Sequence, residues 1–287
     1  SPATDHQWIS VMLTLINGQP ADPSVSVFDG AVLRGDGCFE ALRSYGGRPF
    51  AFAEHHHRLT RSAAALRLPL PAVSDLLDWV ERCAEDGGDC VVRILVTRGA
   101  TGVGAETPPL WVVLWHPLPD PVNDLTLEPV AAPWHAGGES WELAGVKTIS
   151  YAANQAASRR AQEAGFDDAL LISREGEVLE GPTFGIAWLR DGVLETPSLD
   201  LGILESITRG FVLEGCQQIG VPVAYGRYPL ERLRGADEVV AFSTVKEVTR
   251  VRKVGPWQFE PGPVARDLSS FYRSRVQVTP SQTTIGS

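Results

Sequence analysis

The sequence contains very little lysine. Of its 25 basic residues only three are lysines, Lys147, Lys246 and Lys253, and arginine supplies the rest. A lysine amine can lose its proton and form a Schiff base, whereas the guanidinium of arginine stays charged in proteins. A lysine retained in such a chain is therefore a candidate for chemistry that arginine cannot perform, although chance retention is the simpler explanation for Lys253.

Cysteine is also scarce, and its spacing excludes the common metal sites. The four cysteines form no C-x-x-C pair, and no histidine stands at zinc-finger spacing. We expect buried free thiols in a reducing cytoplasm and no bound metal. The run His55-His56-His57 does not change this expectation, because successive helical residues point in different directions. A solvated helix start is expected there.

Long apolar runs and an excess of positive charge are missing too. No run approaches the ~20 apolar residues that a membrane helix needs, and the first residues lack the pattern of a secretory signal. The net charge of −10 argues against nucleic acid as the main partner. We therefore expect a cytoplasmic protein with neither a membrane nor a nucleic-acid partner. Motifs of serine hydrolases, zinc proteases and P-loop proteins are absent.

The composition that is present predicts a globular chain of mixed strands and helices. With 287 residues, 44% of them apolar, the chain is long enough for two domains. Strands and helices do not alternate as regular βαβ units, which favours an α+β fold. Proline and glycine predict a connection at 118–138 between an N-terminal α/β domain, 1–117, and a C-terminal domain, 139–287.

Periodicity and turn residues predict the individual elements. In the first half we expect strands at 9–16, 38–44, 90–97 and 110–115, and helices at 57–68 and 75–84, the second one capped by Ser74. In the second half we expect helices at 152–164, 205–219 and 264–276, and strands at 125–130, 169–173, 177–179, 186–189, 193–196 and 238–242. Asp191-Gly192 is expected to be a hairpin turn.

Two residues, Lys147 and Glu180, have neighbours in the sequence that suit a catalytic or cofactor-binding role. Lys147 has apolar and hydroxylic neighbours and no adjacent carboxylate; desolvation lowers the pKa of a lysine and makes it a nucleophile towards an aldehyde. Glu180 ends an expected strand before a Gly-Pro turn, where a carboxylate can pair with a protonated ring nitrogen. Taken alone, each is more simply explained as a solvated residue.

Two segments have the composition of anion-binding sites. Residues 202–209 open an expected helix, where free N–H groups and the helix dipole favour phosphate. Ser243-Thr244-Val245 ends an expected strand in hydroxyl groups. Arg58 adds a guanidinium suited to bidentate phosphate contact. Ordinary helix capping is the alternative explanation for both segments.

In this order along the chain, the segments resemble the class IV aminotransferases. These are fold-type IV enzymes that depend on pyridoxal 5′-phosphate (PLP), and they include branched-chain and D-amino-acid aminotransferases and aminodeoxychorismate lyase. The resemblance runs from Asp29 to about Val251. The segments that carry it are Gly35-Asp36-Gly37-Cys38-Phe39-Glu40, His55 with Arg58-Leu59 and Ser62-Ala63, Lys147-Thr148 with Tyr151 and Asn154, Gly176-Glu177-Val178-Leu179-Glu180-Gly181, and Gly202-Ile203-Leu204 with Ile207-Thr208-Arg209.

The resemblance implies an N-terminal α/β domain, a C-terminal pseudobarrel, and a homodimer with PLP between the domains. It implies that Lys147 is the Schiff-base and proton-transfer lysine and that Glu180 lies at the pyridine nitrogen. The remaining residues that it implies are Arg58, Ile207, Thr208 and Thr244 at the phosphate, Tyr151 near the ring oxygen or Schiff base, and Val245 at the substrate.

The sequence departs from the family at the substrate end. Arg34 stands where an aromatic residue is common, and Gly185 where asparagine is common. The Arg-x-His carboxylate motif of well-known D-amino-acid aminotransferases does not follow Thr97-Arg98-Gly99. Arg34 and Arg98 are therefore the candidates for binding a substrate carboxylate, with an ion pair as the alternative role for each.

Three functions agree with these residues. The first is a transaminase that moves an amino group between an amino acid, D-amino acids being favoured, and a 2-oxo acid. The second is 4-amino-4-deoxychorismate lyase, which uses the same cofactor residues but releases pyruvate. The third is a non-catalytic ligand-binding relative, against which the presence of both Lys147 and Glu180 argues.

Overall fold

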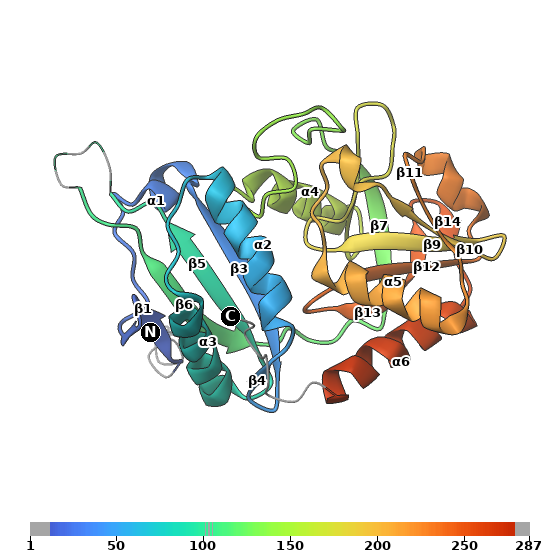
Figure 1. The fold of residues 1–287 in the computed structure, drawn as a ribbon. Coiled ribbons are helices and arrows are strands. Elements are labelled where there is room, and N and C mark those ends of the chain that lie inside the picture. Colours follow the sequence, from blue (N-terminus) through green and yellow to red (C-terminus); the bar gives the residue numbers. More distant parts are fainter. Residues whose placement is uncertain (1–11, 101, 103, 105, 279–287) are drawn as a thin grey trace, which may run out of the picture. The chain divides into compact units, whose positions relative to one another are not determined.

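A computed structural model describes residues 12–100, 102, 104 and 106–278, which form two compact units (Figure 1). The first unit consists of the described residues up to Pro119 together with Val146–Ser150, and the second of Asp120–Gly145 and Tyr151–Val278. Sheets and helices are mixed in both units, as expected for an α+β fold. The division differs from the expected one, because part of the expected connection at 118–138 is a strand of the second unit's sheet.

The first unit is a six-stranded antiparallel sheet with two long helices on one face (Figure 1). The strand order is β2-β1-β6-β5-β3-β4. Helix α2 packs on β3, and helix α3 packs on β5 and β6. The bounds are β1 Thr14–Ile16, β2 Gln19–Pro20, α1 Gly30–Arg34, β3 Gly37–Tyr45, β4 Arg48–Pro49, α2 Phe52–Ala65, α3 Val73–Gly87, β5 Cys90–Thr97 and β6 Trp111–Pro117.

Alternate side chains of β3 point into the core beneath these helices. Cys38 and Leu42 are fully buried there with Ile94 of β5, and Leu59 of α2 and Leu76 of α3 cover them. This period of two is what a strand with one covered face requires. Glu40 lies in the same buried row, which is a costly place for a carboxylate without partners.

Three expectations for the first unit need correction. Helix α2 begins at Phe52 rather than at residue 57, and it ends at Ala65. Helix α3 begins at Val73, so that Ser74 lies inside it and Ala72 is the N-cap, without a side-chain hydrogen bond. Strand β1 begins at Thr14, while residues 9–11 of the expected strand lie outside the described residues.

The second unit contains a mixed sheet of eight strands. The order is β11-β10-β9-β12-β13-β7-β8, with β14 paired to β13; the pairs β10–β11, β13–β7 and β7–β8 are parallel. Helix α4 packs on β7 and β8, and α5 and α6 pack on β12 and β13. The bounds are β7 Asp124–Ala131, α4 Ala152–Glu163, β8 Asp168–Ile172, β9 Gly185–Arg190, β10 Val193–Pro197, α5 Ile207–Ile219, β11 Val223–Gly226, β12 Glu238–Ser243, β13 Glu247–Val254, β14 Trp257–Gln258 and α6 Pro263–Val278.

The second unit follows most of the expected elements. The turn at Asp191-Gly192 joins β9 to β10, and both residues have positive φ, as such hairpin turns require. Glu177 and Val178 form isolated bridges rather than the strand expected at 177–179. Helix α5 begins two residues later than expected, after the N-cap Ser206. Across the described ranges, no helix has both the length and the apolar character needed to cross a membrane.

Candidate active site

The segment that carries Lys147 lies along the beginning of β3. The Phe39 amide donates to the Lys147 carbonyl at 3.1 Å, and the Ile149 amide donates to the Gly37 carbonyl at 2.9 Å. The Lys147 amide donates to Ser62 Oγ of α2 at 3.2 Å. A side chain at Gly37 would bring a Cβ within 2.6 Å of the Ile149 side chain, so this close approach requires glycine.

The Lys147 side chain is half-buried over an aromatic ring. Its Nζ lies 4.3 Å from the centroid of the Phe39 ring. Arg93 of β5 approaches the same ring, with Cζ 5.7 Å from the centroid, and it donates to Nε2 of His116 on β6. Arg93 was not among the site residues predicted from the sequence. The signal for it is the alternation of side chains along β5, which places Arg93 on the face opposite the helix-covered core.

A buried cluster of charged residues lies between β3 and α2. Glu40 is fully buried and accepts hydrogen bonds from Nε and Nη2 of Arg58, both at 2.7 Å. Nδ1 of His55 lies 2.7 Å from the same carboxylate and donates to it, because an ionised carboxylate can only accept. The solvated helix start expected at His55 is therefore wrong: His55 is 1% exposed because its partner Glu40 lies on the sheet beneath it.

The partners of Glu40 determine its charge. Burial opposes its ionisation, but the Arg58 guanidinium and the two side-chain hydrogen-bond donors lower the pKa of Glu40 to about 2. Burial, together with the positive charges of Arg58 and Lys147, lowers the pKa of His55 in spite of its bond to Glu40. The cluster thus holds an ionised carboxylate and a neutral imidazole at neutral pH. It fixes the Arg58 guanidinium, the expected phosphate ligand, against the sheet.

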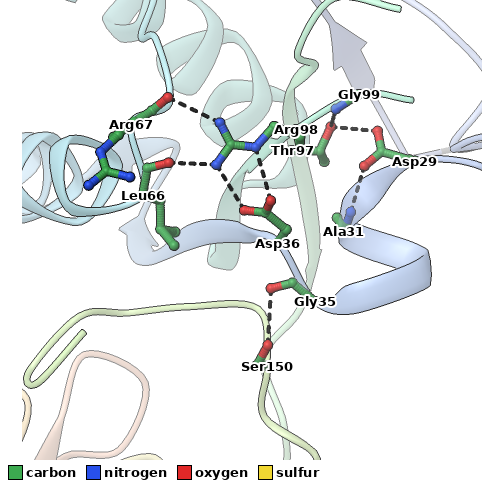
Figure 2. Close-up of polar contacts among 10 residues, drawn as sticks. All are labelled: Asp29, Ala31, Gly35, Asp36, Leu66, Arg67, Thr97, Arg98, Gly99 and Ser150. Carbon is green, nitrogen blue, oxygen red and sulfur yellow. Dashed lines mark hydrogen bonds and ion pairs between the residues drawn. The ribbon is translucent and has the colours of Figure 1, made fainter. Parts of the chain in front are cut away.

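The two arginines considered for a substrate carboxylate differ in their contacts. Arg98 donates to both oxygens of Asp36, each at 3.0 Å, and to the carbonyls of Leu66 and Arg67 (Figure 2). Arg34, the last residue of α1, is exposed, and no described acid lies within ion-pair distance of it. Asp36 and Glu40, the acids that follow it in the chain, bind Arg98 and Arg58 instead.

The loop after Arg34 is held close to the lysine segment. Ser150 Oγ donates to the Gly35 carbonyl at 3.0 Å, and Arg98 holds the adjacent Asp36 (Figure 2). Asp29 caps α1 through the Ala31 amide and accepts a bond from Thr97 (Figure 2). Arg34 therefore stands on an anchored turn.

In the second unit, Glu180 follows the bridge residues that pair with β8. Its two carboxylate oxygens accept the Leu204 amide at 3.2 and 3.3 Å, and His135 Nε2 lies 3.7 Å from Oε1. The turn after it needs glycine at 181, because a Cβ there would overlap the buried Phe184 ring. His135 was not among the site residues predicted from the sequence, because it stands in the stretch predicted to be a connection.

The expected phosphate ligands of the second unit lie on a helix end and on a turn. Ser206 caps α5 by accepting the Arg209 amide, while Ile207 and Thr208 are the first two residues of the helix, where N–H groups have no intrahelical partner. Thr244 and Val245 form the half-buried turn between β12 and β13. Tyr151 is the N-cap of α4 and makes no side-chain capping bond. Within the described ranges, no group of three or more His, Cys, Asp or Glu residues could hold a metal ion.

Comparison with known proteins adds independent information. The sequence matches the family described as amino-transferase class IV over residues 37–254. It is 27% identical to the aminodeoxychorismate lyase of Bacillus subtilis, covering 91% of this chain and 94% of the relative. It is 29% identical to the bifunctional aminodeoxychorismate lyase / D-amino acid transaminase of Mycobacterium tuberculosis, covering 86% and 91%.

Solved structures give the same result. The fold IV-transaminase CpuTA1 from Curtobacterium pusillum superposes with a TM-score of 0.83 at 30% identity, covering 91% of this chain and 92% of the other. The PLP-bound form of a hypothetical aminotransferase from Mycobacterium tuberculosis has a TM-score of 0.84 at 26% identity, covering 92% and 98%. With the family match spanning most of its length and the same fold in a solved transaminase, this chain belongs to the class IV aminotransferases, enzymes that depend on PLP.

Proposed function

We propose that this enzyme transfers an amino group between an α-amino acid, with D-amino acids preferred, and a 2-oxo acid. The observation that carries the proposal is Arg34, an exposed guanidinium without a described acidic partner on a turn bonded to the segment of Lys147. A guanidinium binds a carboxylate in a bidentate manner. Arg93, near the same Phe39 ring as Lys147, adds positive charge on this side.

The residues present fit the cofactor. Lys147 Nζ lies over an aromatic ring, where an amine is partly desolvated. The Glu180 carboxylate has only the Leu204 amide and His135 as described hydrogen-bond or ion-pair partners, which leaves acceptor capacity for a ring N–H. At α5, the amides of Ile207 and Thr208 have no hydrogen-bond acceptor among the described residues and suit a phosphate.

Each residue then has a defined role. Bound PLP supplies the carbonyl carbon that takes up the amino group and a ring that accepts electrons. Lys147 attaches to the cofactor and moves the proton at the substrate carbon as general acid and base. Glu180 accepts a hydrogen bond from the ring nitrogen. The remaining roles are phosphate binding by Arg58, Ile207, Thr208 and Thr244, a hydrogen bond from Tyr151 near the ring oxygen, and substrate contact by Val245.

We further propose that the enzyme acts as a homodimer through the region of α1. Val27, Phe28, Val32 and Leu33 are each more than half exposed although they are large and apolar. Such a cluster on a short segment marks a site of protein association. A second copy of this chain is the partner we propose, since the resemblance to the family implies a homodimer.

A screen of the half-reaction tests the function. Purified enzyme loaded with PLP is mixed with single D- and L-amino acids, and the cofactor absorbance is followed without a 2-oxo acid. We expect D-amino acids to remove the absorbance of the PLP form of the enzyme, and a 2-oxo acid added afterwards to restore that absorbance. A faster loss of absorbance with L-amino acids would reverse the stereochemical assignment. The two lyase-named relatives support aminodeoxychorismate lyase as the second candidate. Release of pyruvate from aminodeoxychorismate, without any added 2-oxo acid, would identify that activity.

A further inference from the structure

His135 lies beside the carboxylate of Glu180 in the second unit. It is not one of the residues proposed to bind the cofactor or the substrate. Its Nε2 is 3.7 Å from Glu180 Oε1, and the two side chains are 11% and 16% exposed. This distance is about 0.5 Å beyond an ordinary N–H···O bond. Hydrogen bonds in active sites are often long before the ligand is bound and shorten afterwards.

The imidazole is oriented by a second contact. The Gly137 amide donates to His135 Nδ1 at 3.4 Å, so that Nδ1 is the acceptor of the ring. In the neutral imidazole the hydrogen is then on Nε2, the nitrogen that faces Glu180. A protonated imidazole would place a hydrogen on the same atom.

The segments that carry His135 and Glu180 are tied to one helix. Trp134 Nε1 donates to Asn154 Oδ1 of α4 at 3.1 Å, and Asn154 Nδ2 donates to the Pro182 carbonyl at 3.2 Å. One side chain therefore fixes the residue before His135 and the turn after Glu180. Bonds from Gly138 to Leu201 and from Gly145 to Gly202 secure the rest of the loop.

Two further groups approach the Glu180 carboxylate. The Leu204 amide donates to it, and the buried Arg209 interacts with it electrostatically. Nε and Nη1 of Arg209 have no hydrogen-bond partner within the described part of the chain. Glu205 is the acid that faces Arg209.

We propose that His135 is a positioning residue for Glu180. By closing the 3.7 Å gap and donating to Oε1 when the cofactor binds, its Nε2–H holds the carboxylate oriented as the acceptor of the PLP ring N–H. The inference rests on the role proposed for Glu180. A donor that is itself held in place orients the carboxylate for its other partner.

Two variants separate this role from a structural one. In His135→Asn the amide can still accept the Gly137 N–H, but the side chain is too short to reach Glu180. In His135→Gln the amide nitrogen reaches about as far as Nε2 and can donate to the carboxylate. His57→Gln is the matched control, since His57 is exposed on α2 of the other unit.

The experiment uses holoenzyme reconstituted with PLP labelled with ¹⁵N in the ring, whose NMR shift reports protonation of that nitrogen. We expect the His135→Asn signal to move towards the unprotonated position and the half-reaction to slow by roughly tenfold, the loss of one hydrogen bond to a charged group. His135→Gln should restore both readouts, and His57→Gln should change neither.

A wild-type ring-nitrogen shift in His135→Asn would overturn the inference, as would failure of His135→Gln to restore the signal. Glu180→Gln, measured in parallel, identifies which step fails. If Glu180→Gln moves the signal while His135→Asn does not, only the role of His135 is wrong. If neither moves it, Glu180 is not the partner of the ring nitrogen and the inference falls with it.

Discussion

The Phe39 amide donates to the Lys147 carbonyl at 3.1 Å, and Nζ of the same lysine lies 4.3 Å from the Phe39 ring centroid. The Phe39 amide therefore positions the backbone of Lys147, and the Phe39 ring positions the end of its side chain. A lysine that is held in this way loses less conformational freedom when it attaches to a cofactor, because part of the ordering cost has been met during folding.

Lys147 is expected to be the residue that attaches to the cofactor. Borohydride reduction of the PLP-loaded enzyme followed by peptide mapping should place the pyridoxyl group on Lys147. Lys147→Ala should abolish turnover and leave the circular dichroism spectrum unchanged, since the backbone bonds of residue 147 to Phe39 and Ser62 do not need its side chain. Lys246→Ala and Lys253→Ala are the controls. A pyridoxyl group on either of those lysines would refute the assignment.

Glu180→Gln should slow the half-reaction strongly. Loss of a hydrogen bond to a charged group costs about 1.5–3 kcal/mol in direct interaction, and weakening of the electron-accepting ring adds to the kinetic effect. Single-turnover measurements of the cofactor absorbance test this. Glu175→Gln is the control, because Glu175 is exposed on the adjacent turn. Near wild-type single-turnover rates in Glu180→Gln would show that the role is wrong.

Arg34→Ala should raise KM for amino acids and hardly change KM for an amine that lacks a carboxylate. The reason is that, in its proposed role, the guanidinium contacts the substrate through the carboxylate alone. Cofactor affinity should stay unchanged, which a PLP titration can measure. Arg48→Ala, an exposed arginine of β4, is the control. An equal loss for both kinds of substrate would indicate a structural arginine instead.

The buried Glu40 should make stability depend on pH. The pKa of Glu40 is about 2 in the folded chain, below the ~4.3 of an unfolded glutamate. Its contribution to the free energy of unfolding is therefore fully present above pH ~4.3 and is lost as the pH falls towards 2. The pKa of His55 is also lowered, so protonation of the unfolded state costs stability as the pH falls below ~6.5. The free energy of unfolding in urea should therefore fall in two stages between pH 7 and pH 3.

Glu40→Gln tests the acidic stage. Removing one partner of a buried ion pair costs about 3–5 kcal/mol, so this variant should be much less stable than wild type at pH 7. The difference should shrink at pH 3, where the wild-type carboxylate also loses its advantage. Glu54→Gln, exposed on α2, should change stability little at either pH. A difference between Glu40→Gln and wild type that is independent of pH would contradict the assigned charge state.

The double variant Val32→Asp/Leu33→Asp should dissociate the proposed dimer. Both side chains are more than half exposed on α1, and charge there would prevent close apolar contact. Sedimentation velocity should show a homodimer for wild type and a monomer for the variant. Val122→Asp, at another exposed valine, is the control. A wild-type protein that sediments as a monomer would refute the proposed association.

Local signals predicted many elements, while partners distant in sequence were harder to find. Helix α4 was predicted to within one residue, because alanine favours helix and Gly165 with φ of 83° ends it. His55 was misjudged, since its burial depends on Glu40, fifteen residues earlier on a strand. The histidine run itself does not indicate that a buried carboxylate will contact one of its members.

Proline misled the division of the chain. Pro129 was assigned to a connection, although it also lies in the strand expected at 125–130; that strand is β7 of the second unit's sheet, where Pro129 pairs with Leu170 of β8. Proline rarely occurs in central strands because it lacks an N–H. Here the pairing of β7 with β13 extends only to Leu127, so Pro129 lies where one edge of the strand is no longer paired. This exception was not visible in the sequence.

The passage of Val146–Ser150 through the first unit has a consequence for biosynthesis. The rest of that unit precedes Asp120, but this segment follows Asp120–Gly145 of the second unit along the chain. Because synthesis proceeds from the N-terminus, more than a hundred residues are translated after β3 before Lys147 can pack beside Phe39. A fragment ending at Pro119 would have its helices and sheet but no residue to bond the Phe39 amide. Lys147 is thus added late to a scaffold that has already been translated.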